Sequence, residues 1–505
     1  MEKLIFKRKI FLIGILALAL LPFFLCDKTR ESKPEEIILA KVGNKTISLN
    51  DFIGRAEYTI RPNYCKGNHN IHKKIVLNSI LAEKMFALEA GDTNALSKNE
   101  HFQRYLEGRK QQAMRQWLYH KQGVEKVTLD EDEIKKIYKL AGRKYRVNYF
   151  NINNDSLAEI TGNELKGNTE SFRSIYSELS GLDTIPEREV DYNIRESEVI
   201  HNALFAEPLN LGDVIGPLKI EDGSHVFIKI NGWIDSHVLN ETDVSQRYRD
   251  VKEDLTRKKA KKIYEQYAAQ IMKGKRIDFY PETFNKLAKI VGTQFFAEKE
   301  KEKERFLNRS FDKELKDQQP EIGIEIKDIK DQPLFRIDGK TWTVDDFAIE
   351  VEIHPLVYRN KKMVSSDFAN QFKLAIVDMI RDKYLAEDAY KKGYDKVDLV
   401  KRTTEMWKDA SIALYHKNQY LKKVSSGEED SFVLIQKYLN PYVDKLQQKF
   451  SDAIEVNIEE FDKLNLTRTD MFVTQSNVPF PVMVPSFPQL TTDHKLDYGK
   501  RMEID

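Results

Sequence analysis

The chain has little cysteine, no excess of charge of either sign and no apolar run of full membrane-spanning length. Its 505 residues include two cysteines, and 81 Lys and Arg residues balance 80 Asp and Glu residues. A general nucleic-acid-binding protein would be markedly basic, so we expect no nucleic-acid partner. The Walker, dinucleotide-binding and nucleophile-elbow motifs are also missing, which argues against the chemistries that those motifs carry.

Length and composition instead indicate several helix-rich domains. A chain of 505 residues is too long for one hydrophobic core, so we expect three or four domains. Charged residues make up 32% of the chain and hydrophobic residues 41%, which suits a soluble protein with heavily solvated helices. Together with the sheet segment described below, the expected fold class is α+β and predominantly α-helical.

The N-terminus carries the pattern of an export signal. Four basic residues within the first nine precede an apolar run of 16 residues, from Ile10 to Leu25. This run is shorter than the roughly 20 residues that span a bilayer, and it has the size and the charged lead of a secretory signal. We therefore expect the protein to be exported, to the periplasmic or the cell-surface side.

Cys26 directly follows this run and resembles the lipid-acceptor cysteine of bacterial lipoproteins, although Leu25 stands where such motifs prefer a small residue. The alternative is a signal anchor that is not cleaved. Either arrangement tethers the protein to a membrane. If Cys26 is lipidated, only Cys65 remains, so no intrachain disulfide can form and the fold must depend on packing.

The chain also contains an internal repeat. Residues 42–52 match residues 337–347 at an offset of 295, and each copy predicts a short strand, a turn with glycine and a helix that opens on aspartate. Residues 80–90 match residues 379–389, and the spacing of apolar residues in both copies is typical of a helix. Chance similarity between amphipathic helices is the alternative explanation.

Two further matches indicate how the copies are organised. The tetrapeptide Leu-Tyr-His-Lys occurs at 118–121 and again at 414–417, at an offset of 296. Residues 277–287 match residues 454–464, but at an offset of only 177, which leaves 119 extra residues in the first copy. We therefore predict one helical module present twice, with a further domain inserted into the first copy. The two flanks of the insertion are expected to pack together.

The inserted segment reads as a small sheet domain. Residues 145–152 alternate as a strand does, and a helix-like stretch covers residues 172–179. Two short apolar stretches at 211–218 and 225–230 then flank a turn with glycine, which predicts two antiparallel strands.

Two parts of the sequence, the end of the inserted segment and the helical module, resemble known protein families. Gly-x-Val-x-x-Pro-Leu at 212–218, followed by Gly-x-His-Val-Phe-Ile-Lys-Ile at 223–230, resembles the closing motif of parvulin-type (PpiC-like) peptidyl-prolyl isomerases. The helical module, which opens with Val-Gly-Asn-Lys-Thr at 42–46, resembles the chaperone domain of the SurA and PrsA foldases. The likeness covers most of residues 38–292 and, more weakly, residues 333–470.

The resemblance implies a periplasmic folding factor whose partners are unfolded or nascent exported proteins. It also implies a chemistry, the rotation of an X-Pro bond over a barrier of about 20 kcal/mol. An apolar pocket that favours the twisted amide lowers this barrier without a metal or a cofactor. We accordingly expect neither a metal nor a cofactor in this protein.

Carried onto this sequence, the parvulin site is incomplete. The second family histidine falls on His225, but the first falls on Tyr149, whose phenol cannot replace an imidazole. The glycine-rich element of the family is missing from residues 187–193. The substrate-binding residues that the resemblance implies are Phe150, Phe205, Leu211 and Phe227. Isomerase activity therefore stays open, and His225 equally suits a role in satisfying a backbone group.

Three other segments allow more than one interpretation. Cys65, His69 and His72 have a zinc-like spacing, but a structural zinc site needs four ligands, so an exposed loop is favoured. Residues 298–305 alternate in charge and predict a solvated linker, with a docking helix as the alternative. The four prolines at 478–488 require an extended tail, which suits a groove of this chain or of a partner.

These observations predict a modular chaperone. The expected divisions are a signal peptide (1–25), a tether (26–37), the first part of module 1 (38–142), a parvulin-like domain (143–234), the completion of module 1 (235–292), a charged linker (293–332), module 2 (333–470) and a proline-rich tail (471–505). The favoured function is the holding of unfolded exported polypeptides. An active isomerase and a membrane-tethered assembly or scaffold lipoprotein are the alternatives.

Overall fold

The computed structural model describes residues 36–502, except for residues 68, 194–195, 221–222, 237–239, 308–325, 361–362, 426–429, 468–470 and 472–480. Helices dominate, and the strands form three small, mainly antiparallel sheets, so the predicted α+β class with a predominance of helix is confirmed. The predicted signal peptide and the lipidation site at Cys26 lie outside the described residues. Within the described part of the chain, no helix is both long enough and apolar enough to cross a membrane.

Each sequence repeat opens with a β-hairpin and a capped helix. The elements are β1 (Ile38–Val42), β2 (Lys45–Ser48) and α2 (Leu49–Glu57) in the first copy, and β8 (Pro333–Ile337), β9 (Lys340–Thr343) and α11 (Val344–Ile353) in the second. In α2 the Ser48 hydroxyl accepts a hydrogen bond from the Asp51 amide, and the Asp51 carboxylate accepts one from the Ser48 amide. Thr343 and Asp346 form the same capping box at α11. The repeated aspartate is therefore a capping residue.

Two long helices follow each hairpin unit. They are α3 (Asn70–Ala90) and α4 (Glu100–Gln122) in the first copy, and α12 (Phe368–Lys391) and α13 (Asp398–Val424) in the second. The matched stretches at 80–90 and 379–389 lie within α3 and α12, as predicted. The two Leu-Tyr-His-Lys tetrapeptides lie on α4 and α13.

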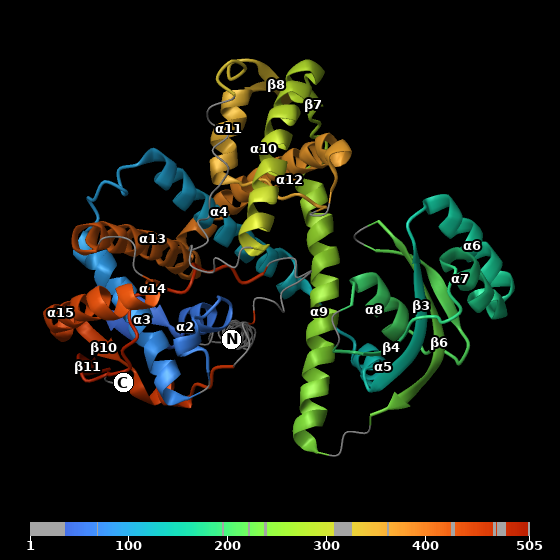
Figure 1. The fold of residues 1–505 in the computed structure, drawn as a ribbon, viewed down its shortest axis with the longest axis horizontal. Helices are drawn as coiled ribbons and strands as arrows, with labels where there is room; N and C mark the ends of the chain where they lie inside the picture. Colours follow the sequence, from blue (N-terminus) through green and yellow to red (C-terminus); the bar gives the residue numbers. More distant parts are fainter. Residues whose placement is uncertain are drawn as a thin grey trace, which may run out of the picture.

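The two copies exchange their second halves. Helix α13 packs along α3, whereas α4 packs against α11 and α12, and the two exchanged helices contact each other (Figure 1). The closing strands are exchanged in the same sense: β10 (Ile454–Val456) pairs with β1, and β7 (Asp278–Phe279) pairs with β8. Each compact unit thus combines the first half of one copy with the second half of the other.

We name the two units by their place in the chain. The terminal module contains β1, β2, α2, α3, α13, α14 (Ser431–Leu434), α15 (Asn440–Phe450), β10, α16 (Ile458–Lys463) and β11 (Lys500–Arg501). The central module contains α4, β7, α10 (Pro281–Leu307), β8, β9, α11 and α12. A π-helical turn at Ile435–Leu439 joins α14 to α15.

The hydrophobic cores follow the exchange. In the terminal module the ring of Phe52 on α2 meets that of Phe461 on α16, with a centroid separation of 6.0 Å. In the central module Phe284 on α10 stacks on Phe372 on α12 at 5.7 Å. Both contacts join residues from different sequence copies.

This exchange corrects the predicted division of the chain. We expected residues 235–292 to complete module 1 and residues 333–470 to form module 2, but β7 and α10 belong to the core of the second hairpin, and residues 454–466 belong to that of the first. The reason is that both hairpins offer an equivalent strand edge to the closing strand. The flanks of the insertion do meet, because α4 packs against α9 (Glu241–Ile271).

The predicted charged linker also differs from the structure. Helix α10 runs to Leu307, and its residues Phe295 and Phe296 pack against the central core. Ile326 and Ile329, near the other end of the predicted linker, are buried in the same core. The apolar side chains before residue 298 therefore hold this helix against the module.

The inserted segment forms a four-stranded antiparallel sheet with helices on both faces. The strands, in the order β4-β3-β6-β5, are β3 (Arg143–Ile152), β4 (Glu187–Asp191), β5 (Val214–Lys219) and β6 (His225–Asp235). Helices α6 (Asp155–Gly167) and α7 (Phe172–Ser180) cover one face, and α5 (Glu131–Leu140), α8 (Glu198–Phe205) and the first half of α9 cover the other. This sheet unit therefore begins at α5, before the predicted boundary at residue 143.

Gly108 provides a test of the exchanged position of α4. A Cβ atom at Gly108 would lie 2.2 Å from the carbonyl oxygen of Ile353 on α11. We expect Gly108→Ala to lower the free energy of unfolding by about 2 kcal/mol or more, because backbone cannot yield as a flexible side chain does. Urea denaturation followed by tryptophan fluorescence measures the change.

Gly167→Ala is the matched control, because a Cβ at this helical position meets nothing within 4 Å. Alanine there should leave stability unchanged or raise it by up to about 1 kcal/mol. A Gly108→Ala protein as stable as this control would show that α4 does not pack on α11.

Candidate functional site

The residues predicted to line a prolyl pocket lie in different parts of the sheet unit. Phe150 and Phe227 stack with their ring centroids 5.1 Å apart, buried beneath α6 and α7. Phe205 lies on the opposite face of the sheet, in the core shared with α5 and α9. Leu211 is 72% exposed. The predicted set therefore does not converge on one pocket.

The two residues predicted as catalytic are also separated. His225 lies on the same face as Phe227, two residues along β6. Tyr149 packs against the opposite core, with the Arg188 guanidinium 5.0 Å from its ring centroid. Consecutive side chains of a strand point to opposite faces, so Tyr149 cannot share the face of its neighbour Phe150. The structure therefore does not bring Tyr149 and His225 together on one face of the sheet.

His225 is buried at the start of β6. Its Nε2 lies 3.6 Å from Oδ1 of Asp155, and Asp155 also accepts a hydrogen bond from Lys219. The Nδ1 atom of His225 is buried without a hydrogen-bond partner among the described residues. This histidine has a carboxylate neighbour, as a site residue would, but α6 and α7 cover the aromatic rings on its face.

The closing motif contributes to this covering of the face. Gly162 on α6 lies against Pro217 of β5, and a Cβ at Gly162 would stand 2.6 Å from the Pro217 Cδ. The absence of a side chain at residue 162 thus lets α6 lie directly on the motif. The proline that carries the family resemblance is consequently a packing residue in this chain.

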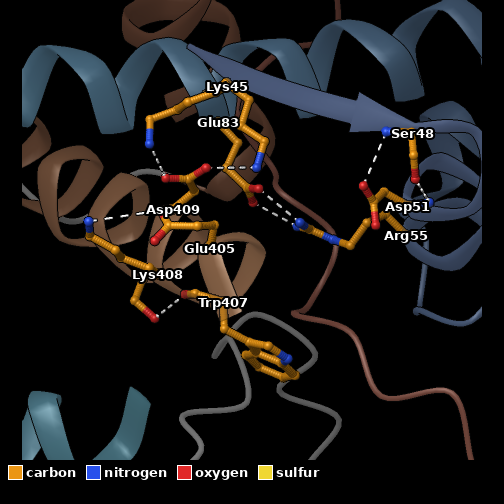
Figure 2. A network of polar contacts seen from close by, with 11 residues as sticks. Lys45, Ser48, Asp51, Arg55, Glu83, Glu405, Trp407, Lys408 and Asp409 are labelled. Atoms are coloured by element: carbon orange, nitrogen blue, oxygen red, sulfur yellow. Dashed lines mark hydrogen bonds and ion pairs between the residues drawn. The ribbon is translucent and has the colours of Figure 1, made fainter. Parts of the chain in front are cut away.

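A buried network of charges joins the exchanged parts of the terminal module. Asp409 on α13 accepts hydrogen bonds from Lys45 at 2.5 Å and from Lys84 at 2.8 Å. Arg55 and Glu83 form a bidentate pair beside it, at 2.8 and 2.7 Å. Figure 2 shows both groups together, with Lys45 and Arg55 near the hairpin and Asp409 on α13.

Sequence reasoning missed this network. Its signal was present on α13, where Asp409 follows the buried Met406 by three residues and precedes the buried Ala413 by four. This spacing places a charge on the core face of a helix. A charge at such a position needs a partner, and Lys45 and Lys84 supply it from the other copy.

The central module has its own buried polar cluster. Arg115 lies on α4. It donates a hydrogen bond to Nδ1 of His354 at 3.1 Å and lies 3.7 Å from Asp382. Lys383 pairs with Glu350 at 3.0 Å. Burial lowers the pKa of His354 to about 3, and the charges of Arg115 and Lys383 act in the same direction. Since arginine can only donate, the neutral imidazole must accept at Nδ1.

The segment around Cys65 differs from the predicted exposed loop. Cys65 is buried in the terminal core at the end of a short 3-10 turn, Asn63–Cys65, while His69 is exposed. Across the described ranges, no three His, Cys, Asp or Glu side chains are grouped so that they could hold a metal ion.

Comparisons with known proteins yield no relative: no family model, no curated protein and no solved structure matches this chain. A function must therefore be inferred from the residues of this chain. The best-defined polar groupings are the two buried networks, and each joins a helix of one copy to the hairpin unit of the other.

Asp409 provides a test of the terminal network. In an Asp409→Ala variant, the buried Lys84 and the partly buried Lys45 keep their charges without a counter-charge. We expect the free energy of unfolding to fall by about 3–5 kcal/mol, as is usual when one partner of a buried pair is removed. Lys408→Ala is the control: its pair with the exposed Asp92 should contribute less than about 1 kcal/mol. Equal losses in the two variants, measured by urea denaturation, would contradict the network.

His354 provides a test by pH. The folded-state pKa of about 3 lies below the unfolded value near 6.5, so the unfolded chain binds a proton that the folded chain does not. Stability should therefore fall as the pH drops from 7 towards 3, by about 2 kcal/mol between pH 7 and pH 5. The His354→Gln protein lacks this titrating group. Its free energy of unfolding should therefore fall by about 2 kcal/mol less than that of the unchanged protein between pH 7 and pH 5. Parallel pH profiles of the two proteins would contradict the prediction.

Proposed function

We propose that this chain is an extracytoplasmic folding factor that binds unfolded exported polypeptides. Its two helical modules would correspond to the chaperone domain of SurA and PrsA, and its sheet unit to a parvulin domain that has lost most of its catalytic apparatus. The N-terminal segment would tether it to a membrane, through a lipid on Cys26 or through a signal anchor.

The observation that carries this proposal is the apolar outer surface of the sheet unit. Ile160 on α6 is 64% exposed, and Leu157 lies three residues before it and is also exposed. Leu179 at the end of α7 and Leu182 just after it are exposed as well. Figure 1 shows α6 and α7 side by side, on the side of the sheet that faces away from α9. Exposed apolar surface of this kind marks a site of interaction.

The terminal module adds further exposed apolar residues. Ile60 and Ile71 are both more than half exposed, on either side of Tyr64 in the chain. The Tyr64 ring lies 5.7 Å from that of Phe432, which is also exposed. Exposed apolar residues at several separate places suit the weak binding of an unfolded chain. Each contact adds little binding free energy, so affinity comes from many contacts spread over a large area.

The geometry of the sheet unit favours a holding function over an isomerase function. Catalysis in the parvulin manner would need an open apolar pocket beside a pair of polar side chains. Phe150 and Phe227 are instead core residues, and Tyr149 and His225 lie on opposite faces. These positions support binding without efficient isomerisation.

Suppression of aggregation tests the proposal. The protein should keep a chemically unfolded, unrelated protein in solution when it is diluted from denaturant, as followed by light scattering. The double variant Leu157→Ser and Ile160→Ser should suppress aggregation several-fold less, because it removes apolar area from α6. Glu159→Ser with Glu164→Ser, two exposed polar positions on the same helix, is the control and should act as the unchanged protein does.

Two results would contradict the proposal. No suppression by the unchanged protein would favour the scaffold alternative. A protease-coupled proline assay in which the protein accelerates isomerisation, with the acceleration lost in His225→Ala, would favour the active isomerase.

A further inference from the structure

The described end of the chain lies extended over the terminal module and reaches α4 of the central module. Residues 481–497 adopt neither helix nor strand, and residues 500–501 then form β11 beside β10. Of the two interpretations of this tail, a groove of its own chain is therefore the one that the structure adopts for residues 481–502. The part from 472 to 480 lies outside the described residues.

Four side chains donate hydrogen bonds to main-chain carbonyl groups of this segment. They are Arg55 to Ser486 at 2.7 Å, Ser79 to Thr491 at 3.4 Å, Asn78 to Asp493 and Lys495 at 2.8 Å each, and Gln116 to Pro481 at 3.0 Å. Three of these donors are buried: Arg55, Asn78 and Ser79. Every residue has a carbonyl group, proline included, so such donors recognise an extended chain whatever its side chains are.

The same groove also receives apolar side chains. Phe487 and Leu490 are buried in the terminal core. Val484 lies against Gly54 on α2, where an added Cβ would stand 3.2 Å from the valine Cγ1. Glycine within a helix costs about 0.5–1 kcal/mol relative to alanine, and the close approach of the segment explains its presence.

Arg55 is held in place for this contact. Its two terminal nitrogens bind the carboxylate of Glu83, and Nη2 also donates to the Ser486 carbonyl. The buried carboxylate thus compensates the charge of the guanidinium and fixes its plane. The donor would remain oriented in the absence of the tail, which is what a preformed site requires.

We propose that this groove, formed by α2, α3, α4 and α15, is a binding site for extended, proline-containing polypeptide segments. On α15, Asn440 accepts hydrogen bonds from the Thr492 amide and the Thr491 hydroxyl. The tail is its resident occupant, and a client must displace it. Residues 481–490 contain three prolines and bind the groove through carbonyl groups, so a segment without amide protons at those positions fits equally well. This inference rests on the proposed function and names the class of ligand.

The test exchanges the tail for a peptide. A protease site is placed after Asn477 in the full chain, and the cleaved protein is mixed with a fluorescein-labelled peptide of residues 478–499. We expect fluorescence anisotropy to show binding at least about tenfold tighter than to the uncleaved protein. A second peptide that keeps only the prolines and the apolar character of positions 484, 487 and 490 should compete. A tail that never exchanges, or that only its own sequence displaces, overturns the proposal.

A second variant leaves the chain uncut. Phe487→Asp with Leu490→Asp should release the tail and leave the groove free, so this protein should bind the labelled peptide about tenfold more tightly than the unchanged protein. Met483→Ser, at an exposed tail position, is the control and should change nothing. Unfolding of the terminal module in the double variant also overturns the proposal, because a displaceable occupant must leave a folded groove.

The two proposals fail separately. If suppression of aggregation depends on Leu157 and Ile160 while no peptide enters the groove, the folding function stands and this site does not. If peptide exchanges but aggregation is not suppressed, the groove stands without the proposed function.

Discussion

The contact between α13 and the first hairpin unit is the constraint on which the rest of the structure depends. Asp409 lies between Lys45 and Lys84, so the last third of the chain is joined to its beginning by buried charges that are costly to separate. This contact places α15, α16 and the tail over α2 and α3. It also leaves α4 to the other hairpin unit, where Arg115 meets His354 and Asp382. The exchange therefore follows from two buried polar clusters as well as from apolar packing.

The exchange nests one module within the other along the chain. All the elements of the central module lie between Glu100 and Lys391, whereas the terminal module needs both β1 and β11. The sheet unit needs only a contiguous segment. Contacts that are local in sequence form at a lower cost in loop entropy, so this order favours the sheet unit first and the terminal module last. We therefore expect the groove under the tail to be the last part of the molecule to form.

The sheet unit is built around packed aromatic residues. Its aromatic residues fill two cores, one on each face of the sheet, and Gly162 lets α6 lie directly on Pro217. With the inner faces of α6 and α7 occupied in this way, their remaining apolar residues, Leu157 and Ile160 among them, point outwards. In the function that we propose, the exposed apolar residues and the groove that holds the tail would both bind other chains.

Sequence by itself determined the elements of this protein, because periodicity and capping act locally. It predicted the repeats, the helices at 80–90 and 379–389 and the strands at 145–152 and 225–230. Tertiary structure alone decided which halves combine, since two similar hairpins offer the same edge to either closing strand. It also decided that Tyr149 and His225 face apart. A bulge between Arg146 and Val147 sets the register there, and a shift of one residue moves a side chain to the other face.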